Sequence, residues 1–364
     1  MSTVLDPHDP LSAALRDEIG AEIARFIDDR RDLLTDVGPE ALVLGDLAQA
    51  FAAGGKRMRP AFAVWGAVAA AGVPDDPALW IRAAASLDLL HTGILIHDDV
   101  MDSSDTRRGL PAAHHQLAAR HAEHHLLGEP QGFGRAGAIL LGDLMQLWSI
   151  EMLDTSGLSA IDLDRARPAL ARMRTEVTCG QFLDVHVQHE PIHDGQHALL
   201  AAARVVEYKT AKYTVQRPVQ FGALLGGGSD ELLAGLEAYG SALGRAFQFR
   251  DDLLGVFGDE VTTGKPAGDD LREGKRTVLV AHAFTGTTDA GRALLTSLLG
   301  DPTMDADQIA ELRGLIVDSG APELVESMIA EGFEGALAAL RAPMTEEGRT
   351  ALTQLALAAT QRTF

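Results

Sequence analysis

The hydrophobic positions recur with the spacing of α-helices along almost the whole chain. Between residues 11 and 36, apolar side chains stand at every fourth position, namely Leu15, Ile19, Ile23 and Ile27. This spacing places them on one helical face, where a packed core can cover them. Further apolar runs of helical length predict helices over residues 42–53, 61–71, 80–105, 136–153, 163–188, 197–222 and 232–256, with two or three more at the C-terminal end.

Glycine and polar residues interrupt this helical pattern in two places. The glycine-rich stretch 54–60 (GGKRMRP) ends one helix, and its proline can open the next helix at the first turn. Residues 114–134 contain five histidines, a residue type that binds transition metals, but the segment has no cysteine. Its several glycines and Pro130 indicate instead an exposed surface loop.

The composition favours a single all-α domain spanning residues 1–364. Hydrophobic residues make up 46% of the chain and can build a large core, whereas aromatic residues make up only 5%. The chain is rich in alanine, leucine and glycine, and alternating runs of β-branched residues are hard to find, which favours helices over strands. We find neither a linker of disordered composition nor a repeat of fixed period that would divide the chain.

Charge and cysteine usage narrow the class of protein further. The formal net charge of −21 argues against nucleic acid as a partner, because binding phosphates directly needs a basic face. The single cysteine, Cys179, excludes an intramolecular disulfide and fits a reducing compartment. The polar first ten residues do not resemble a signal peptide, and no uninterrupted apolar run reaches the length of a membrane span. We therefore expect a cytoplasmic protein.

An acidic cluster follows the long apolar run over residues 81–96. Asp98 and Asp102 are four residues apart, so on a helix they share one face and repel each other unless a cation lies between them. Oxygen ligands of this kind suit a hard divalent ion such as Mg²⁺. Arg107 and Arg108 follow and could bind a phosphate beside the metal. Adjacent aspartates alone, however, most often mark a solvated helix end.

A second acidic cluster strengthens the interpretation of the first as a metal site. Gln248, Asp251 and Asp252 project from one side of a helix at the end of another apolar run. Two such helices facing each other would form acidic walls across a cleft, where Mg²⁺ ions could bind an oligophosphate. Basic residues stand near glycine turns or the acidic clusters at Lys56, Arg59, Arg107, Arg108, Lys209, Lys265 and Lys275.

Taken together, these residues resemble the trans-isoprenyl diphosphate synthases, the polyprenyl synthetase family. The motifs that carry the resemblance are, in order, residues 54–60, 98–109, Gly180-Gln181 with Asp184, Lys209-Thr210, residues 248–252 and residues 263–268 (TGKPAG). The resemblance covers roughly residue 46 to the last helices. Residues 250–280 look most like the geranylgeranyl diphosphate synthases of high-GC Gram-positive bacteria.

The resemblance implies a fold, a reaction and a cofactor. The fold would be an isoprenoid-synthase-type helical bundle around a central cavity, in a homodimer. The reaction would be the head-to-tail condensation of isopentenyl diphosphate with an allylic diphosphate, assisted by about three Mg²⁺ ions. Metal Lewis acidity would stabilise the leaving group, and the apolar walls would shield the carbocation from water.

The resemblance also assigns roles to individual residues. The metal ligands would be Asp98, Asp99, Asp102, Asp251 and Asp252, with Asp184 near the metals. The isopentenyl diphosphate site would comprise Lys56, Arg59, His91 and Arg108. The allylic diphosphate site would comprise Arg107, Lys209, Thr210, Gln248, Lys265 and Lys275. The aspartate pairs, Arg107 and Lys209 would act directly in catalysis. One position departs from the family, because Gly255 stands where the second motif usually has a third aspartate.

The length of the product depends on the floor of the apolar pocket. In the family, a bulky aromatic residue five positions before the first aspartate shortens the product, and here that residue is Gly93. An open floor predicts geranylgeranyl diphosphate, with farnesyl or longer polyprenyl diphosphates as alternatives. At about 100° per residue, however, Gly93 lies far from the face of Asp98. We therefore add Ile94, Leu90 and Leu87 as candidate floor residues.

Two other functions compete with the synthase. A class I terpene cyclase also uses an aspartate-rich helix and Mg²⁺, but its second metal motif is not found here. A non-catalytic subunit of a heteromeric synthase would tend to lose an aspartate motif, whereas Asp98, Asp99 and Asp102 are all present.

Overall fold

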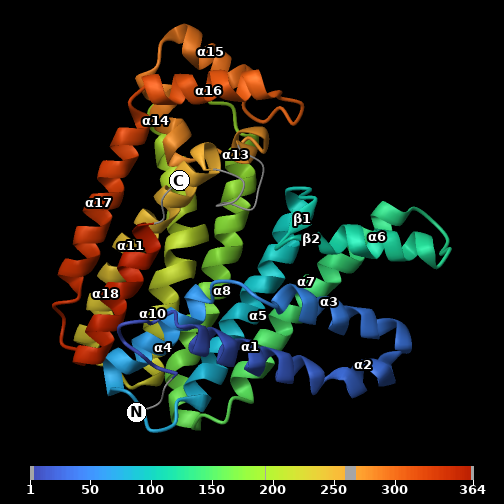
Figure 1. The fold of residues 1–364 in the computed structure, drawn as a ribbon, viewed down its shortest axis with the longest axis vertical. Coiled ribbons are helices and arrows are strands. Elements are labelled where there is room, and N and C mark those ends of the chain that lie inside the picture. Colours follow the sequence, from blue (N-terminus) through green and yellow to red (C-terminus); the bar gives the residue numbers. More distant parts are fainter. Residues whose placement is uncertain (1–3, 193, 259–267, 362–364) are drawn as a thin grey trace.

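Helices make up nearly all of the regular structure in the part of the chain that is described. The computed structural model describes residues 4–192, 194–258 and 268–361. Within these ranges, the helices pack side by side, and only one short two-stranded hairpin accompanies them (Figure 1). The all-α prediction is therefore confirmed.

The elements run as follows. The helices are α1 (Ala13–Asp28), α2 (Arg31–Val37), η1 (Pro39–Ala41), α3 (Leu42–Ala52), α4 (Met58–Ala71), α5 (Ala78–Met101), α6 (Ala113–Glu123), α7 (Pro130–Asp154), α8 (Ala160–His189), α9 (Gly195–Val205), η2 (Val206–Gln216), α10 (Arg217–Leu225), α11 (Asp230–Phe257), α13 (Asp269–Arg272), α14 (Val278–Gly286), α15 (Asp289–Leu298), α16 (Ala306–Asp318), α17 (Ala321–Ala339) and α18 (Glu346–Thr360). The strands β1 (Thr106–Arg107) and β2 (Leu110–Pro111) pair antiparallel between α5 and α6.

Helix α5 lies in the middle of the larger of two apolar clusters. It contacts α1, α3, α4 and α7, and Leu87, Leu89 and Leu90 are fully buried on different sides of it. A helix that is apolar all round is stable only when other elements surround it. The second cluster joins the upper part of α11 to α14, α15, α16 and α17, toward the top of Figure 1. Hydrophobic packing therefore fixes the positions of α5 and α11, the two helices that carry the aspartate pairs.

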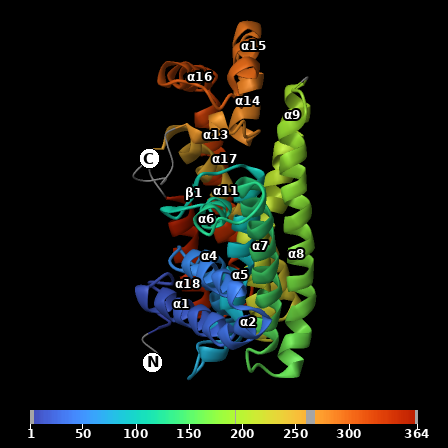
Figure 2. The ribbon, with the colours of Figure 1, turned by 90° about the vertical axis from the view of Figure 1, so that its right-hand side faces the viewer.

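Serine side chains define where the long helices α8 and α11 begin. The hydroxyl of Ser159 accepts a hydrogen bond from the backbone N–H of Asp162, and Ser229 caps Leu232 in the same way. Each cap satisfies a backbone donor that the first helical turn leaves without a partner, and is worth about 1 kcal/mol. Figure 2 shows α8 running along one side of the molecule, and it packs against η2 and α10.

Several expected boundaries need correction. The loop expected over residues 114–134 is limited to residues 124–129, because residues 113–123 form α6, which packs on α7, and residues 130–134 belong to α7 itself. Gly134 permits this packing, since a Cβ there would overlap the carbonyl oxygen of His114. His114 and His121 are buried in consequence. The helices expected over residues 11–36 and 197–222 are divided into α1 and α2, and into α9, η2 and α10.

The C-terminal region differs from expectation, because six helices, rather than two or three, follow residue 268 within the described residues.

Helices α5 and α7 reach the length and mean hydropathy of a membrane span, although charged residues such as Asp88 and Asp143 interrupt their apolar runs. Two such helices are weak evidence for a membrane, and 67% of the apolar window of α5 is buried inside the protein. Core helices of soluble proteins pass the same test.

Candidate active site

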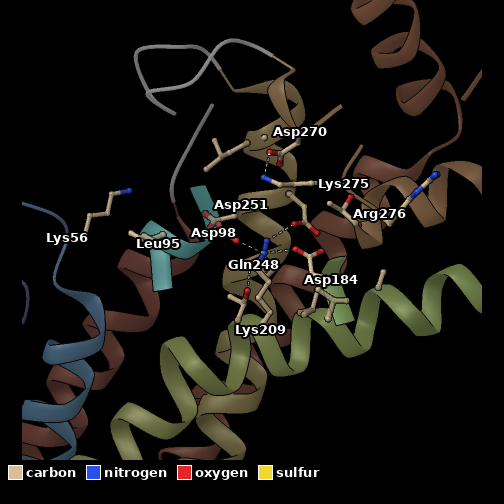
Figure 3. Close-up of a pocket in the computed structure, with 18 residues that line it drawn as sticks. Lys56, Leu95, Asp98, Asp184, Lys209, Gln248, Asp251, Asp270, Lys275 and Arg276 are labelled. Atoms are coloured by element: carbon tan, nitrogen blue, oxygen red, sulfur yellow. Dashed lines mark hydrogen bonds and ion pairs between the residues drawn. The ribbon is translucent and has the colours of Figure 1, made fainter. Parts of the chain in front are cut away.

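A cavity of about 650 Å³ opens where the C-terminal ends of α5 and α11 approach α8, η2 and α14 (Figure 3). The structure brings nine of the residues predicted from the sequence to its wall: Lys56, Asp98, Asp184, Lys209, Thr210, Gln248, Asp251, Asp252 and Lys275. Apolar wall residues include Leu95, Ala202, Val205, Val206 and Leu254. The cavity wall is therefore partly highly charged and partly apolar.

One wall centres on Asp98, in the last turn of α5. Its Oδ1 accepts a hydrogen bond of 2.6 Å from Nε2 of Gln181 and lies 3.4 Å from Nζ of Lys209. Lys209 Nζ also donates to Oδ2 of Asp184 on α8. Burial lowers the pKa of Lys209, but the charges of Asp98 and Asp184 outweigh it and hold the pKa above its usual value. Lys209 therefore carries a positive charge between two carboxylates.

Asp99 and Asp102 extend this wall beyond the cavity lining. Asp99 is fully buried and pairs with Arg107, whose Nε lies 2.9 Å from its Oδ1. Asp102 caps the C-terminus of α5, one turn after Asp98, as the spacing predicted. Burial, followed by the charge of Asp98, raises the pKa of Asp102 to about 6. Asp102 therefore binds its proton more tightly than an exposed aspartate does.

The opposite wall is a chain of hydrogen bonds on η2 and α11. Thr210 Oγ1 donates to Oε1 of Gln248 over 2.6 Å, and Gln248 Nε2 donates to Oδ1 of Asp252 over 2.7 Å. The other carboxylate oxygen of Asp252 is buried and has no hydrogen-bond partner within the described residues. Burial, with the charges of Asp270 and Asp251, raises the pKa of Asp252 to about 8. A buried carboxylate oxygen that lacks a hydrogen-bond partner is suited to bind a cation.

The segment that carries Lys209 and Thr210 is a π-helix rather than a regular α-helix. Its hydrogen bonds span residues 206–216, between α9 and α10. Gly180 on α8 permits its close approach, because a Cβ there would lie 2.6 Å from the backbone nitrogen of Lys209. π-helical turns are rare, and they occur frequently at functional sites.

A hairpin and a glycine-rich loop form a basic region beside the cavity. Arg108 and Gly109 turn the chain between β1 and β2, both with positive φ (53° and 76°), as two-residue hairpins require. Arg108 Nη1 donates to the carbonyl oxygen of Phe51 over 2.7 Å, so the hairpin holds the end of α3. Arg57 lies in the loop after α3 and forms a buried ion pair with Asp88 of α5. These contacts fix the loop that carries Lys56.

Arg59, His91 and Tyr213 form a group close to this loop, in which Tyr213 is buried and the other two residues are half-buried. The guanidinium of Arg59 lies 4.3 Å from the ring centre of Tyr213 and donates to Thr214 Oγ1 over 2.8 Å. Burial, with the charges of Arg59 and Arg108, holds the pKa of His91 well below its usual value, so the ring is neutral. His91 Nδ1 and the Tyr213 hydroxyl are buried with no hydrogen-bond partner within the described residues. Tyr213 was not among the predicted site residues.

The donor set fits Mg²⁺, although the carboxylates do not form a ready-made cage. Their oxygens are the ligands that this ion prefers, and Asp252 offers a buried oxygen without a partner. Within residues 4–192, 194–258 and 268–361, no three carboxylate, histidine or cysteine side chains converge on one point. Lys209 instead lies between Asp98 and Asp184. The predicted metal ligands therefore remain a prediction.

The predicted chain-length residues do not line this cavity. Gly93 faces α7, because a Cβ there would lie 2.8 Å from the carbonyl oxygen of Gly142. Leu87 and Leu90 are fully buried in the core, and Ile94 packs against the same core. The apolar residue of α5 on the cavity wall is Leu95, three residues before Asp98 and on the same helical face. Helical spacing from Asp98 could have identified it.

Other wall residues were also missed or lie beyond description. Gln181 was part of a recognised motif but had no assigned role, and it contacts Asp98 directly. Asp270 and Arg276 line the cavity, but nothing in the sequence places them near α11. Lys275 pairs with Asp270 and Glu273, over 2.9 and 2.7 Å. Lys265 and residues 263–267 of the TGKPAG motif lie outside the described residues.

Comparison with known proteins gives one consistent family. Residues 42–316 match the polyprenyl synthetase family. The chain is 31% identical to a short chain isoprenyl diphosphate synthase of Methanothermobacter thermautotrophicus, over 93% of this chain and 96% of that protein. It is also 31% identical to a geranylgeranyl diphosphate synthase of Mycobacterium tuberculosis, over 93% and 91% of the two chains. A crystal structure of geranylgeranyl pyrophosphate synthase from Corynebacterium glutamicum, complexed with isoprenyl diphosphate and magnesium, superimposes with a TM-score of 0.91 and 38% identity, covering 99% of this chain and 100% of that one.

The crossing of α5 and α7 at Gly93 predicts the effect of a bulky residue there. Gly93→Phe should lower the free energy of unfolding by about 1–3 kcal/mol, because the ring would push α7 away. Urea unfolding followed by circular dichroism measures this change. Gly314→Phe is the matched control, since a Cβ at that position of α16 meets no atom within 4 Å. Equal stability of Gly93→Phe and the unchanged protein would contradict the close crossing.

Proposed function

The chain belongs to the polyprenyl synthetase family, and from this premise we propose that it condenses isopentenyl diphosphate with allylic diphosphates, mainly to geranylgeranyl diphosphate. It is a prenyltransferase that elongates prenyl diphosphates, as its relatives are. The observation that best supports the reaction is the cavity in which two aspartate-bearing helix ends face each other across Lys209 and Gln248.

In this proposal, two groups of residues hold the two diphosphates. Lys209 and Thr210, with Arg107 nearby, bind the allylic diphosphate beside the aspartates. Lys56, Arg59 and Arg108 bind isopentenyl diphosphate. Arginine offers paired donors that match phosphate oxygens, whereas lysine offers a point charge. The two groups meet at the hairpin, where Arg107 and Arg108 are neighbours.

The aspartate pairs would hold the magnesium. Asp98 on α5, Asp184 on α8, and Asp251 and Asp252 on α11 line the same cavity. Asp102 follows Asp98 by one turn at the C-cap of α5. About three ions would supply Lewis acidity that stabilises the departing pyrophosphate. The negative walls would attract a divalent cation, and the bound cation would allow an acidic protein to bind phosphates.

The apolar part of the wall protects the reacting carbon. Leu95 of α5 and Leu254 of α11 line the cavity beside the aspartates. Val205 of α9 and Val206 of η2 line it from another side. These side chains exclude water from the allylic cation, which would otherwise be hydrolysed. The double bond of isopentenyl diphosphate would then attack the cation and form the new carbon–carbon bond, and the released pyrophosphate would take up the proton that is lost.

Product analysis tests the proposed function directly. Purified protein is incubated with Mg²⁺, isopentenyl diphosphate and an allylic starter, and the products are measured by mass spectrometry. A linear twenty-carbon diphosphate is expected. Only fifteen-carbon product, or only longer chains, would contradict the proposed length. A cyclic hydrocarbon without isopentenyl incorporation would indicate a cyclase, and no turnover would indicate a non-catalytic subunit.

Removing the first aspartate should abolish turnover while preserving the fold. Asp98→Ala should lower kcat at least about 100-fold, because the site loses a metal ligand in a water-poor cavity. Lys209 keeps its second partner, Asp184, so circular dichroism should be unchanged. Asp105→Ala is the matched control, since the Asp105 side chain is 93% exposed and belongs to the same acidic segment. Near-normal kcat in Asp98→Ala would contradict the metal role.

We also propose that the chain forms a homodimer through the outer face of α7. Five large apolar side chains on this helix are exposed: Phe133, Ile139, Leu140, Leu147 and Ile150. Leu140 and Leu147 are 61% and 62% exposed, and Phe133, Leu140 and Leu147 follow each other at intervals of seven. An apolar stripe of this kind on a soluble protein marks an interaction surface, and helical stripes pair readily with a second copy.

Charge placed on the α7 stripe should separate the dimer. Leu140→Asp combined with Leu147→Asp should shift the mass measured by light scattering after size-exclusion chromatography from two chains to one. Val317→Asp is the control, because Val317 is similarly exposed on α16, far from α7. A dimer that survives both aspartates would show that another surface joins the subunits.

A further inference from the structure

Gly255 stands where the second aspartate motif usually carries a third carboxylate, and another side chain occupies the space beside it. A Cβ built on Gly255 would overlap Oδ2 of Asp270 and would lie 2.5 Å from its Cγ. No aspartate can therefore be placed at position 255 while Asp270 keeps its position. Because Gly255 has no side chain, a carboxylate from a different segment can lie against this face of α11.

Ion pairs fix the orientation of Asp270. Lys275 Nζ lies 2.9 Å from Asp270 Oδ1, and Lys275 is itself held by Glu273 over 2.7 Å. The second oxygen, Oδ2, points toward α11 over Gly255. Asp270 belongs to the cavity wall, and Figure 3 shows it above Asp251 and next to Lys275.

The position of this carboxylate matches the spacing of the motif. Position 255 follows Asp251 by four residues and Asp252 by three, so it lies on the same face of α11, one turn further on. Asp252 Oδ2 is buried and lacks a hydrogen-bond partner within the described residues.

We propose that Asp270 supplies, from α13, the third carboxylate that α11 lacks at Gly255, and that it faces the Mg²⁺ held by Asp251 and Asp252. The inference rests on the metal-dependent function proposed above. Lys275 holds one oxygen of Asp270 and leaves the other for the ion or for one of its water ligands. Asp270 thus stands at the place of the missing third carboxylate, although within the described residues the three carboxylates do not already converge on one point.

Magnesium binding tests this role without relying on turnover. Mg²⁺ is titrated in the presence of inorganic pyrophosphate, and binding is followed by calorimetry and by the shift in Tm. Asp270→Asn keeps the shape of the side chain and should weaken Mg²⁺ binding about 10- to 100-fold, as for other carboxylates that orient a bound metal. Asp318→Asn, an exposed aspartate at the end of α16, should bind like the unchanged protein.

A carboxylate exchange separates this role from a purely structural one. Asp270→Ala should weaken Mg²⁺ binding, and adding Gly255→Asp to it should recover at least about tenfold, the scale of one outer carboxylate. Gly255→Asp alone should be destabilised, because two carboxylates would compete for one space. Failure of the double variant to bind better than Asp270→Ala, or unchanged binding in Asp270→Asn, would overturn the proposal.

The unchanged protein distinguishes this inference from the proposed function. If it elongates prenyl diphosphates with Mg²⁺ while Asp270→Asn keeps normal Mg²⁺ binding, the function holds and the role of Asp270 is wrong. If the unchanged protein binds neither Mg²⁺ nor pyrophosphate, the proposed function itself fails, and the inference falls with it.

Discussion

Mutual repulsion among crowded carboxylates is the constraint on which the geometry of this site depends. Asp98 and Asp102 are one turn apart on α5, and Asp252 lies near Asp251 and Asp270. Partial burial strengthens these repulsions, because protein screens charge less well than water. Each cluster is balanced by a cation from another element: Lys209 from η2, Arg107 from β1 and Lys275 from the segment before α14. The charges therefore tie together segments that are distant in the sequence.

The charged cluster is positioned by hydrophobic packing rather than by its own attractions. Helix α5 is buried on all sides over most of its length and delivers Asp98 at its end, and α11 delivers Asp252 in the same way. The repulsion among carboxylates at the C-terminal ends of α5 and α11 is tolerated, because the free energy gained by burying the apolar residues of these helices outweighs it. Lys209 and Thr210 belong to the π-helix η2, whose backbone hydrogen bonds differ from those of a regular α-helix.

Local patterns in the sequence predicted the positions of the site's main residues well, and predicted contacts between distant segments poorly. Helical spacing and the two acidic motifs are local, so they placed Asp98 and Asp251 correctly on facing helix ends. The contact between Asp270 and Gly255 depends on how α13 folds back over α11, which no spacing along the chain reveals. The histidine-rich segment was misread for a similar reason, since its helix forms against α7. Nor does apolar periodicity distinguish a π-helix from an α-helix.

Helix α7 is the single layer of structure between α5, which carries the first aspartate motif, and the protein surface. Its inner face crosses α5 at Gly93 and Gly142, and His97 Nε2, next to Asp98, lies 2.8 Å from the carbonyl oxygen of Ile139. Its outer face carries the exposed leucines at positions 140 and 147. A second chain seated on that face would restrain a helix only about 10 Å thick. Because interiors are closely packed, α5 would be restrained with it. Dimerisation can thus order the first aspartate motif without placing any residue of the partner in the cavity.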